Sequence, residues 1–152
     1  NWKTFTGLNI EEPEISTAQE LPYESRSFMQ EGDYLWVATN KGLIRILNKA
    51  AKPGAYEIFE PRFKDSTSIG GKKINMLVKD SSGRIWIGTQ ESGLSYIAGY
   101  DKKNQPIFKN YLPAYGVKGA LQNERVSCLL VDSKKRLWIG TYKGLHLYQP
   151  AM

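Results

Sequence analysis

The chain has few of the residues on which many catalytic and metal sites depend. Its 152 residues include one cysteine and one histidine. A single cysteine excludes an internal disulfide and a cysteine-rich zinc cluster, and a single histidine excludes a histidine-rich metal site. We therefore predict no metal and no cofactor. Cys128 lies in the apolar run 126–131, and we expect it to be a small buried hydrophobic residue.

Long apolar stretches are also missing. No run approaches the roughly 20 apolar residues that a membrane-spanning helix needs, and residues 1–4 have no apolar signal core. Hydrophobic residues make up 41% of the chain and charged residues 24%, the balance of a globular domain. We expect contact with a membrane only through a parent protein.

Signals for catalysis are weak. His146 lies in a predicted strand at 145–148 without a serine or cysteine nucleophile motif, so we expect a partly buried strand histidine. Asp80 and Asp132 recur in equivalent turns, which favours a structural role over a catalytic carboxylate pair. The segment 69–73 lacks the strand–loop–helix context of a phosphate loop. We predict that the chain is not an enzyme.

The net charge is +6 and the pI is about 9.3, which permits a nucleic-acid partner without requiring one. The basic pairs at 72–73, 102–103 and 134–135 all fall in predicted turns. Turn lysines commonly keep a surface solvated. We predict no nucleic-acid partner.

What the chain does have is an internal repeat. One pattern occurs three times, in segments 35–43, 85–94 and 137–145. It runs apolar residue, tryptophan, apolar residue, small residue and threonine, and it continues through a short turn to Gly-Leu. The tryptophans Trp36, Trp86 and Trp138 are about 50 residues apart, a period that fits the four strands of a β-propeller blade.

The tryptophan strands carry large residues on both faces, which indicates burial on both faces. A small residue follows two positions after each tryptophan (Ala38, Gly88 and Gly140). We infer that it leaves room for a bulky side chain of the adjoining blade. We therefore assign the three tryptophans to a structural core between blades and not to a ligand-stacking ladder.

Taken together, the pattern predicts an all-β fold of β-propeller blades of four antiparallel strands, with three blades in this chain. The 152 residues form a single propeller segment. Blade one covers about 24–61, blade two about 73–112 and blade three about 125–149. Blade three stops one strand short, and residues 2–6, which resemble 108–111, could supply an outer closing strand.

Residues 80–94 identify a family. Their sequence, Asp-Ser-Ser-Gly-Arg-Ile-Trp-Ile-Gly-Thr with Gly-Leu at 93–94, resembles the two-component regulator propeller repeat. Residues 132–145 match with Lys135 in place of the glycine, and residues 30–43 match more loosely, with Gln30 at the position of the aspartate.

The resemblance implies a role and a location. Such repeats form propellers, usually of seven blades, in the periplasmic sensor regions of bacterial hybrid two-component histidine kinases. It implies a ligand-sensing module that recognises a saccharide in the periplasm. The motif residues are structural, so the family supplies no binding residues.

Three blades are too few for a closed ring, which usually needs about four to eight. The chain is therefore either part of a longer propeller or one half of an assembly. Two chains would give six blades, with residues 2–6 exchanged or docked as the closing strand. A two-fold pair is the commonest closed assembly. We expect self-association or further propeller blades.

Propeller ligands commonly bind at the mouth of the central channel, on loops. We expect one mouth to combine the hairpins after the tryptophan strands with the long connections into the inner strands. A small-molecule ligand such as an oligosaccharide would find stacking surfaces and hydrogen-bonding groups there. The candidate ligand-binding residues are Asn40, Lys41, Gln90, Glu91, Tyr115, Asn123, Arg125, Tyr142 and Lys143.

Two alternatives remain open. The first is a structural or protein-interaction propeller that binds partners through the same mouth, which the sequence does not separate from a saccharide sensor. The second is a propeller lyase or hydrolase, because streptogramin lyases carry similar tryptophan-containing repeats. Such an enzyme should bring a histidine and acidic residues together at a channel mouth, and one histidine on a strand disfavours it.

Overall fold

Alternating apolar residues between short turns fold into β-strands throughout the described part of the chain. The computed structural model describes residues 23–47 and 56–150, and these ranges contain no helix. Nothing within them could therefore cross a bilayer as a long apolar helix. The strands are β1 (Ser25–Glu31), β2 (Tyr34–Thr39), β3 (Gly42–Leu47), β4 (Tyr56–Phe59), β5 (Ile74–Lys79), β6 (Ile85–Thr89), β7 (Leu94–Tyr100), β8 (Pro106–Tyr111), β9 (Val126–Val131), β10 (Leu137–Thr141) and β11 (Gly144–Tyr148).

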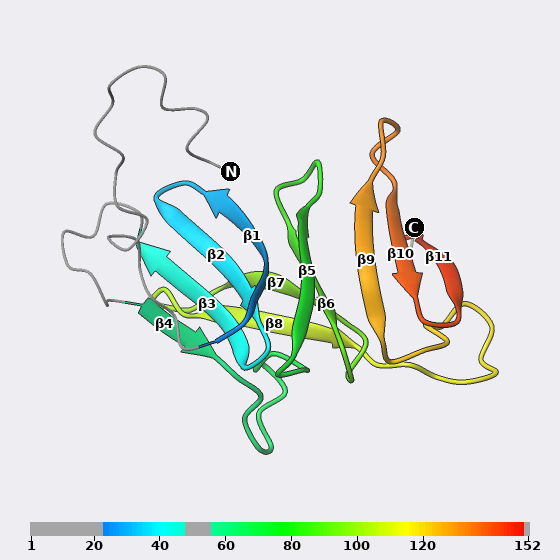
Figure 1. Ribbon diagram of the computed structural model, residues 1–152, viewed down its shortest axis with the longest axis horizontal. Coiled ribbons are helices and arrows are strands. Elements are labelled where there is room, and N and C mark those ends of the chain that lie inside the picture. The colour runs from blue at the N-terminus through cyan, green and yellow to red at the C-terminus, as the bar shows by residue number, and fades with distance from the viewer. Residues whose placement is uncertain (1–22, 48–55, 151–152) are drawn as a thin grey trace, which may run out of the picture.

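The strands form three antiparallel meanders, β1-β2-β3-β4, β5-β6-β7-β8 and β9-β10-β11. Figure 1 shows the first strands of the sheets, β1, β5 and β9, side by side, with the later strands of each sheet leading away from them. The predicted all-β fold of propeller blades is confirmed. The third sheet has three strands, and residues 2–6, predicted to close it, lie outside the described residues.

Two of the strand turns are held by an aspartate, as the sequence predicts. The carboxylate of Asp80 accepts two backbone N–H groups of its own turn, at 2.9 and 3.0 Å, and the indole N–H of Trp86 at 2.7 Å. Asp132 makes the same set of bonds, with the indole of Trp138 at 2.9 Å. Each aspartate thus fastens the turn to the central strand of its blade.

The first blade departs from this pattern, and the alignment of Gln30 with the two aspartates is wrong. Gln30 lies opposite Leu35 inside the paired part of β1 and β2. Because the following turn is shorter, Glu31 is the residue that corresponds to the aspartates. The Nε1 atom of Trp36 and the Oε2 atom of Glu31 are both buried and have no hydrogen-bond partner among the described residues.

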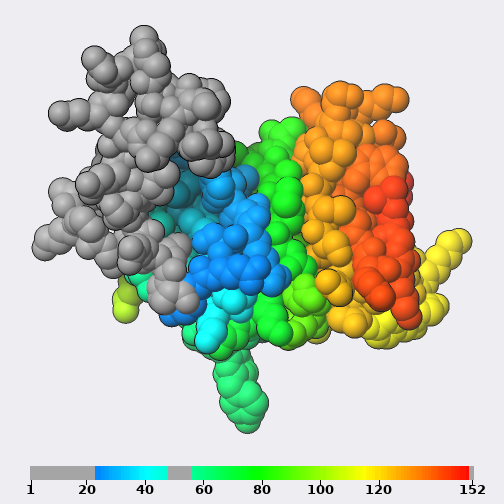
Figure 2. All heavy atoms as spheres, in the orientation of Figure 1, coloured from blue at the N-terminus to red at the C-terminus, as the bar shows by residue number. Residues whose placement is uncertain are grey.

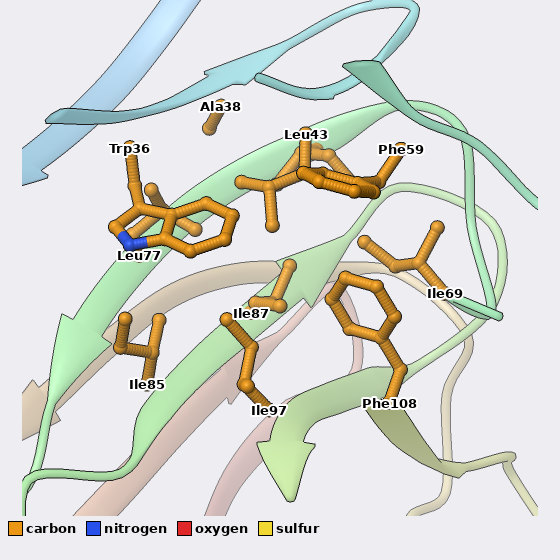
Figure 3. Packing of buried hydrophobic residues seen from close by; sticks show 11 residues of the cluster. Trp36, Ala38, Leu43, Phe59, Ile69, Leu77, Ile85, Ile87, Ile97 and Phe108 are labelled. Atoms are coloured by element: carbon orange, nitrogen blue, oxygen red, sulfur yellow. The ribbon is translucent and has the colours of Figure 1, made fainter. Parts of the chain in front are cut away.

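The core lies between neighbouring sheets, as Figure 3 shows for the first two. Trp36 and Ala38 of the first sheet face Leu77 and Ile85 of the second, and all four are buried. Figure 2 shows the same sheets packed without a gap along the surface. Among residues 23–47 and 56–150, no further sheet covers the outer face of the last one.

Small residues let the sheets approach, as predicted. A Cβ atom added to Gly88 would lie 2.7 Å from Cγ1 of Val126, which comes from the following blade. Gly140 has no such neighbour, because no sheet follows it among the described residues, and its nearest contact is Cys128 of its own blade. Cys128 itself is exposed. The expectation that Cys128 is buried is therefore wrong, for the same reason.

Candidate ligand-binding rim

Two kinds of loop meet at one end of the blades. The hairpin after each tryptophan strand is bonded to the end of the connection that enters the same sheet. The bonds run from Asn40 N to Glu24 O (3.2 Å), from Gln90 N to Lys73 O (2.8 Å) and from Tyr142 N to Arg125 O (3.0 Å). We call this edge the rim: residues 24, 26, 40, 41, 73, 75, 90, 91, 124, 125, 142 and 143.

A threonine holds each hairpin of the rim. The hydroxyl of Thr39 donates to Gly42 O at 2.8 Å, and that of Thr89 donates to Gly93 O at 2.8 Å. Thr141 makes the same bond to Gly144 O at 3.0 Å. The repeated Thr at the end of the tryptophan strand therefore fixes the backbone, while the two or three residues of the hairpin are free to differ between blades.

The rim carries a chain of polar contacts across the sheets. Arg26 donates from Nη1 to Asn75 Oδ1 at 2.6 Å. Asn75 in turn donates from Nδ2 to Gln90 Oε1 at 3.1 Å and to Val126 O at 2.8 Å. Lys73 and Glu91 form an ion pair at 2.8 Å. Most of these groups are already bonded to one another and present a pre-organised polar surface.

Blade three contributes an aromatic platform to the rim. The guanidinium carbon of Arg125 lies 5.4 Å from the centre of the Tyr142 ring, and the ring is 71% exposed. Lys143 follows it in the hairpin and is exposed. An exposed ring beside cationic donors can stack on an apolar face while bonding polar substituents.

The structure brings most of the predicted residues together. Asn40, Gln90 and Tyr142 occupy equivalent hairpin positions, and Lys41, Glu91 and Lys143 follow them. The Oδ1 atom of Asn40 is buried without a hydrogen-bond partner among the described residues. These residues share one edge, as predicted for a mouth, although ligand binding by them stays a prediction.

Tyr115 and Asn123 differ from the rest. Tyr115 is exposed, and its hydroxyl bonds the carboxylate of Glu124. That bond raises the pKa of Tyr115 and lowers the pKa of Glu124. Asn123 is 4% exposed and accepts the backbone N–H of Arg125 at 3.0 Å. The buried side chain of Asn123 therefore stabilises the backbone of the connection 112–125 and is not exposed to a ligand.

Sequence reasoning missed Arg26 and Asn75. Both lie where the register of a first strand shifts, between Ser25 and Ser27 in β1 and between Ile74 and Met76 in β5. A β-bulge of this kind re-aims a side chain. The sequence does place a polar residue at the second position of each inner strand. It does not show the β-bulge that turns the side chain toward the rim.

The tryptophans lie away from the rim. Trp36 and Trp86 are 1% and 0% exposed and pack between sheets. Trp138 is half-buried, because no further sheet covers its blade among the described residues. None of the three offers a free ring to a ligand at the hairpin edge.

The acidic turn residues belong to the opposite ends of the strands. Burial opposes ionisation of Asp80, but hydrogen bonds from Ser82, Trp86 and Arg84 together hold the pKa of its carboxyl below the usual value. The pKa of Asp132 is also lowered, chiefly by the bond from Trp138. Within residues 23–47 and 56–150, no group of three or more acidic, histidine or cysteine side chains could hold a metal ion.

Comparison with known proteins gives a family match over part of the chain and similar solved structures. The profile of the two-component regulator propeller family matches residues 68–91 and 120–143, which contain the second and third tryptophan strands. A search of curated proteins found no match.

Two solved structures of the extracellular domain of one B. thetaiotaomicron protein are similar to this chain. One, described as a one component system, is 24% identical, with a TM-score of 0.65 over 91% of this chain and 16% of its own. The other, described as a hybrid two component system, is 23% identical, with a TM-score of 0.66 over 92% of this chain and 17% of its own. The chain thus spans about a sixth of the length of those solved extracellular domains, and the likeness establishes the fold.

Proposed function

We propose that this chain is a ligand-binding module of a bacterial two-component sensor, because two of its stretches match the model of the two-component regulator propeller family. The ligand is a saccharide that binds at the rim, and the module works in the periplasm. The location is supported by the similar structures, which are extracellular domains.

One observation carries the proposal. The backbone bond between hairpin and connection repeats in all three blades, whereas the side chains it presents differ from blade to blade: Asn40, Gln90 and Tyr142. A constant scaffold with polar groups that vary from blade to blade is the arrangement by which loops on rigid frames acquire specificity. Structural turns have no need of such variation.

The chemistry of the rim suits an acidic sugar. The ring of Tyr142 can stack on a pyranose face, Arg125 lies beside it, and the exposed Lys143 is the next residue of the hairpin. Lys73 is already paired with Glu91. The exposed cations of the third blade are thus placed to bind a carboxylate on the sugar, which favours uronic-acid oligosaccharides over neutral ones.

The test is binding of defined oligosaccharides to the 152-residue chain, first on a glycan array and then by calorimetry with the best uronic-acid oligosaccharide. We expect Tyr142→Ala and Lys143→Ala each to weaken binding at least tenfold. Lys134→Ala removes another exposed lysine, from the opposite end of the same blade, and should leave affinity unchanged. Absence of binding to every saccharide would overturn the proposal and leave a protein-interaction propeller as the better account.

A further inference from the structure

The connection from β4 to β5, residues 60–73, projects from the rim end of the blades. Figures 1 and 2 show it reaching past the ends of the strands, at the end where β1, β5 and β9 begin. Its second half is anchored to the second blade: Phe108 N donates to Thr67 O at 2.9 Å, and Asn110 Nδ2 donates to Ser68 O at 3.0 Å. Its last residue belongs to the rim. The projecting part therefore stands on a fixed base.

A braced turn forms the tip of this connection. Asp65 N donates to Arg62 O at 3.2 Å, which leaves Phe63 and Lys64 at the corner of the turn. The Asp65 carboxylate accepts the backbone N–H and the hydroxyl of Thr67 at 2.9 and 2.6 Å, and Nε of Arg62 at 2.8 Å. Lys64 has a φ of 55°, which L-amino acids rarely adopt. The bonds of Asp65 thus hold the turn in a conformation that Lys64 disfavours.

The connection from β8 to β9, residues 112–125, repeats this turn over the same length of chain. The same pair of backbone bonds closes both: from Asp65 N to Arg62 O and from Ser68 N to Asp65 O in one, and from Val117 N to Ala114 O and from Ala120 N to Val117 O in the other. Gly116, with a φ of 75°, takes the place of Lys64. Phe63 is therefore the counterpart of Tyr115, a residue that the sequence already marks as a candidate for ligand binding.

The ring of Phe63 is presented to water. The residue is 91% exposed, and Nζ of Lys64 lies 5.3 Å from the ring centre. Single exposed apolar side chains are common on protein surfaces, but this one is an aromatic that recurs at the same corner of an equivalent turn. Because so little of the ring is buried, it contributes little to the fold and is available to a ligand.

The surroundings of the ring favour a sugar over an apolar protein surface. The exposed neighbours of Phe63 in the turn are polar: Arg62, Lys64 and Ser66. An aromatic anchor in a protein interface is normally ringed by side chains that exclude water, whereas this turn supplies groups that bond it. A sugar stacks one face on a single aromatic ring and bonds the polar groups beside it. The rim carries the same combination of ring and cation at Tyr142 and Arg125.

We propose that Phe63 and Lys64 form a second sugar subsite beside the rim, in which the phenyl ring stacks on a uronic-acid residue and the ammonium binds its carboxylate. The subsite rests on the saccharide function proposed above. Figure 1 places the tip of this connection apart from the β10–β11 hairpin that carries Tyr142, with β5 and β6 between them. A long oligosaccharide therefore occupies both subsites, and a disaccharide bound at Tyr142 does not reach Phe63.

The length of the ligand provides the test. Calorimetry on the full 152-residue chain compares a disaccharide and an octasaccharide from the uronic-acid series with the strongest array signal. We expect Phe63→Ala to weaken octasaccharide binding about fivefold or more and to leave disaccharide binding unchanged, whereas Tyr142→Ala weakens both. Phe63→Trp keeps a stacking ring and should retain octasaccharide binding. Because Phe63 is exposed, both of its variants should keep the fold.

Lys64→Gly isolates the contribution of the ammonium. Glycine adopts a positive φ freely, as Gly116 does in the equivalent turn, so this variant keeps the turn. It should weaken octasaccharide binding about threefold or more at low salt. Lys102→Ala is the control, because it removes an exposed lysine from the other end of the blades, and it should leave binding unchanged.

The outcomes separate the second subsite from the proposed function. Equal octasaccharide affinity in the unmodified chain and in Phe63→Ala would overturn the second subsite and leave the rim as a saccharide site. An equal loss of disaccharide and octasaccharide binding in Phe63→Ala would also overturn it, because a separate subsite affects only the longer ligand. An unmodified chain that binds neither sugar would overturn both proposals.

Discussion

Lys135 adopts a backbone conformation that L-amino acids rarely take. Its φ is 64°, and it occupies the place of Gly83, whose φ is 85°, in the equivalent turn of the second blade. The turn is imposed on Lys135 by the bonds that Asp132 makes to backbone N–H groups on either side. The aspartate therefore stabilises a turn whose last residue is strained.

Replacing Lys135 by glycine should relieve this strain. We expect Lys135→Gly to raise the free energy of unfolding by about 0.5–1 kcal/mol, measured by urea denaturation. Lys134→Gly is the matched control, because Lys134 has no positive φ and glycine there should be neutral or destabilising. A loss of stability in Lys135→Gly would contradict the interpretation.

At the scale of the elements, contact between sheets depends on one small residue in each central strand. Gly88 on β6 and Val126 on β9 meet across the second and third sheets, and Val126 is fully buried. Ala38 takes the same position in the first sheet. Side-chain size at this position therefore sets how closely one blade approaches the next.

A methyl group at Gly88 should force the two sheets apart. We expect Gly88→Ala to lower the free energy of unfolding by about 1–3 kcal/mol, because the new Cβ would lie 2.7 Å from Val126 Cγ1. Gly99→Ala is the control on β7, where no atom lies within 4 Å of the added Cβ, and it should change stability little. Adding Val126→Ala should restore part of the loss, whereas additive losses would argue against direct contact.

At the scale of the molecule, Asn75 links all three sheets. Its side chain bonds Arg26 of the first sheet and the backbone of Val126 in the third, while the residue itself belongs to the second. The first strands of the blades are thus joined in a row by hydrogen bonds as well as by apolar packing. We expect the described sheets to unfold as one cooperative unit.

Removing this link should weaken the whole assembly of blades. We expect Asn75→Ala to lower the free energy of unfolding by about 1–3 kcal/mol, because the Val126 carbonyl and the Arg26 guanidinium lose a partner. Ser127→Ala alters the exposed counterpart on β9 and should have little effect. Equal effects of the two substitutions in thermal unfolding would rule out the bridging role.

Periodic and local features of the fold could be predicted from the sequence. The recurrence of Trp36, Trp86 and Trp138 indicates three blades, because a four-strand unit has a nearly constant length. The positions of Asp80 and Asp132 indicate the turns, because an aspartate bonds the backbone close to it in sequence. Both inferences are local or periodic, and both are confirmed.

Features that depend on distant neighbours could not be predicted. Cys128 is exposed, although its sequence surroundings are as apolar as those of a buried residue, because the sheet that would cover it is missing from the described structure. The mismatch at Gln30 has a local cause instead, a turn that is shorter than those of the other blades.

The sequence by itself determined the blade architecture, the turn aspartates and the edge at which the variable hairpins would gather. These depend on side-chain alternation and repeat length, which are properties of the chain near each residue. Only the tertiary structure decided that bulges turn Arg26 and Asn75 toward the rim, and that the Nδ1 atom of His146 is buried without a hydrogen-bond partner among the described residues. Those outcomes depend on register and on which surfaces find a neighbour, and both are settled only when the sheets pack together.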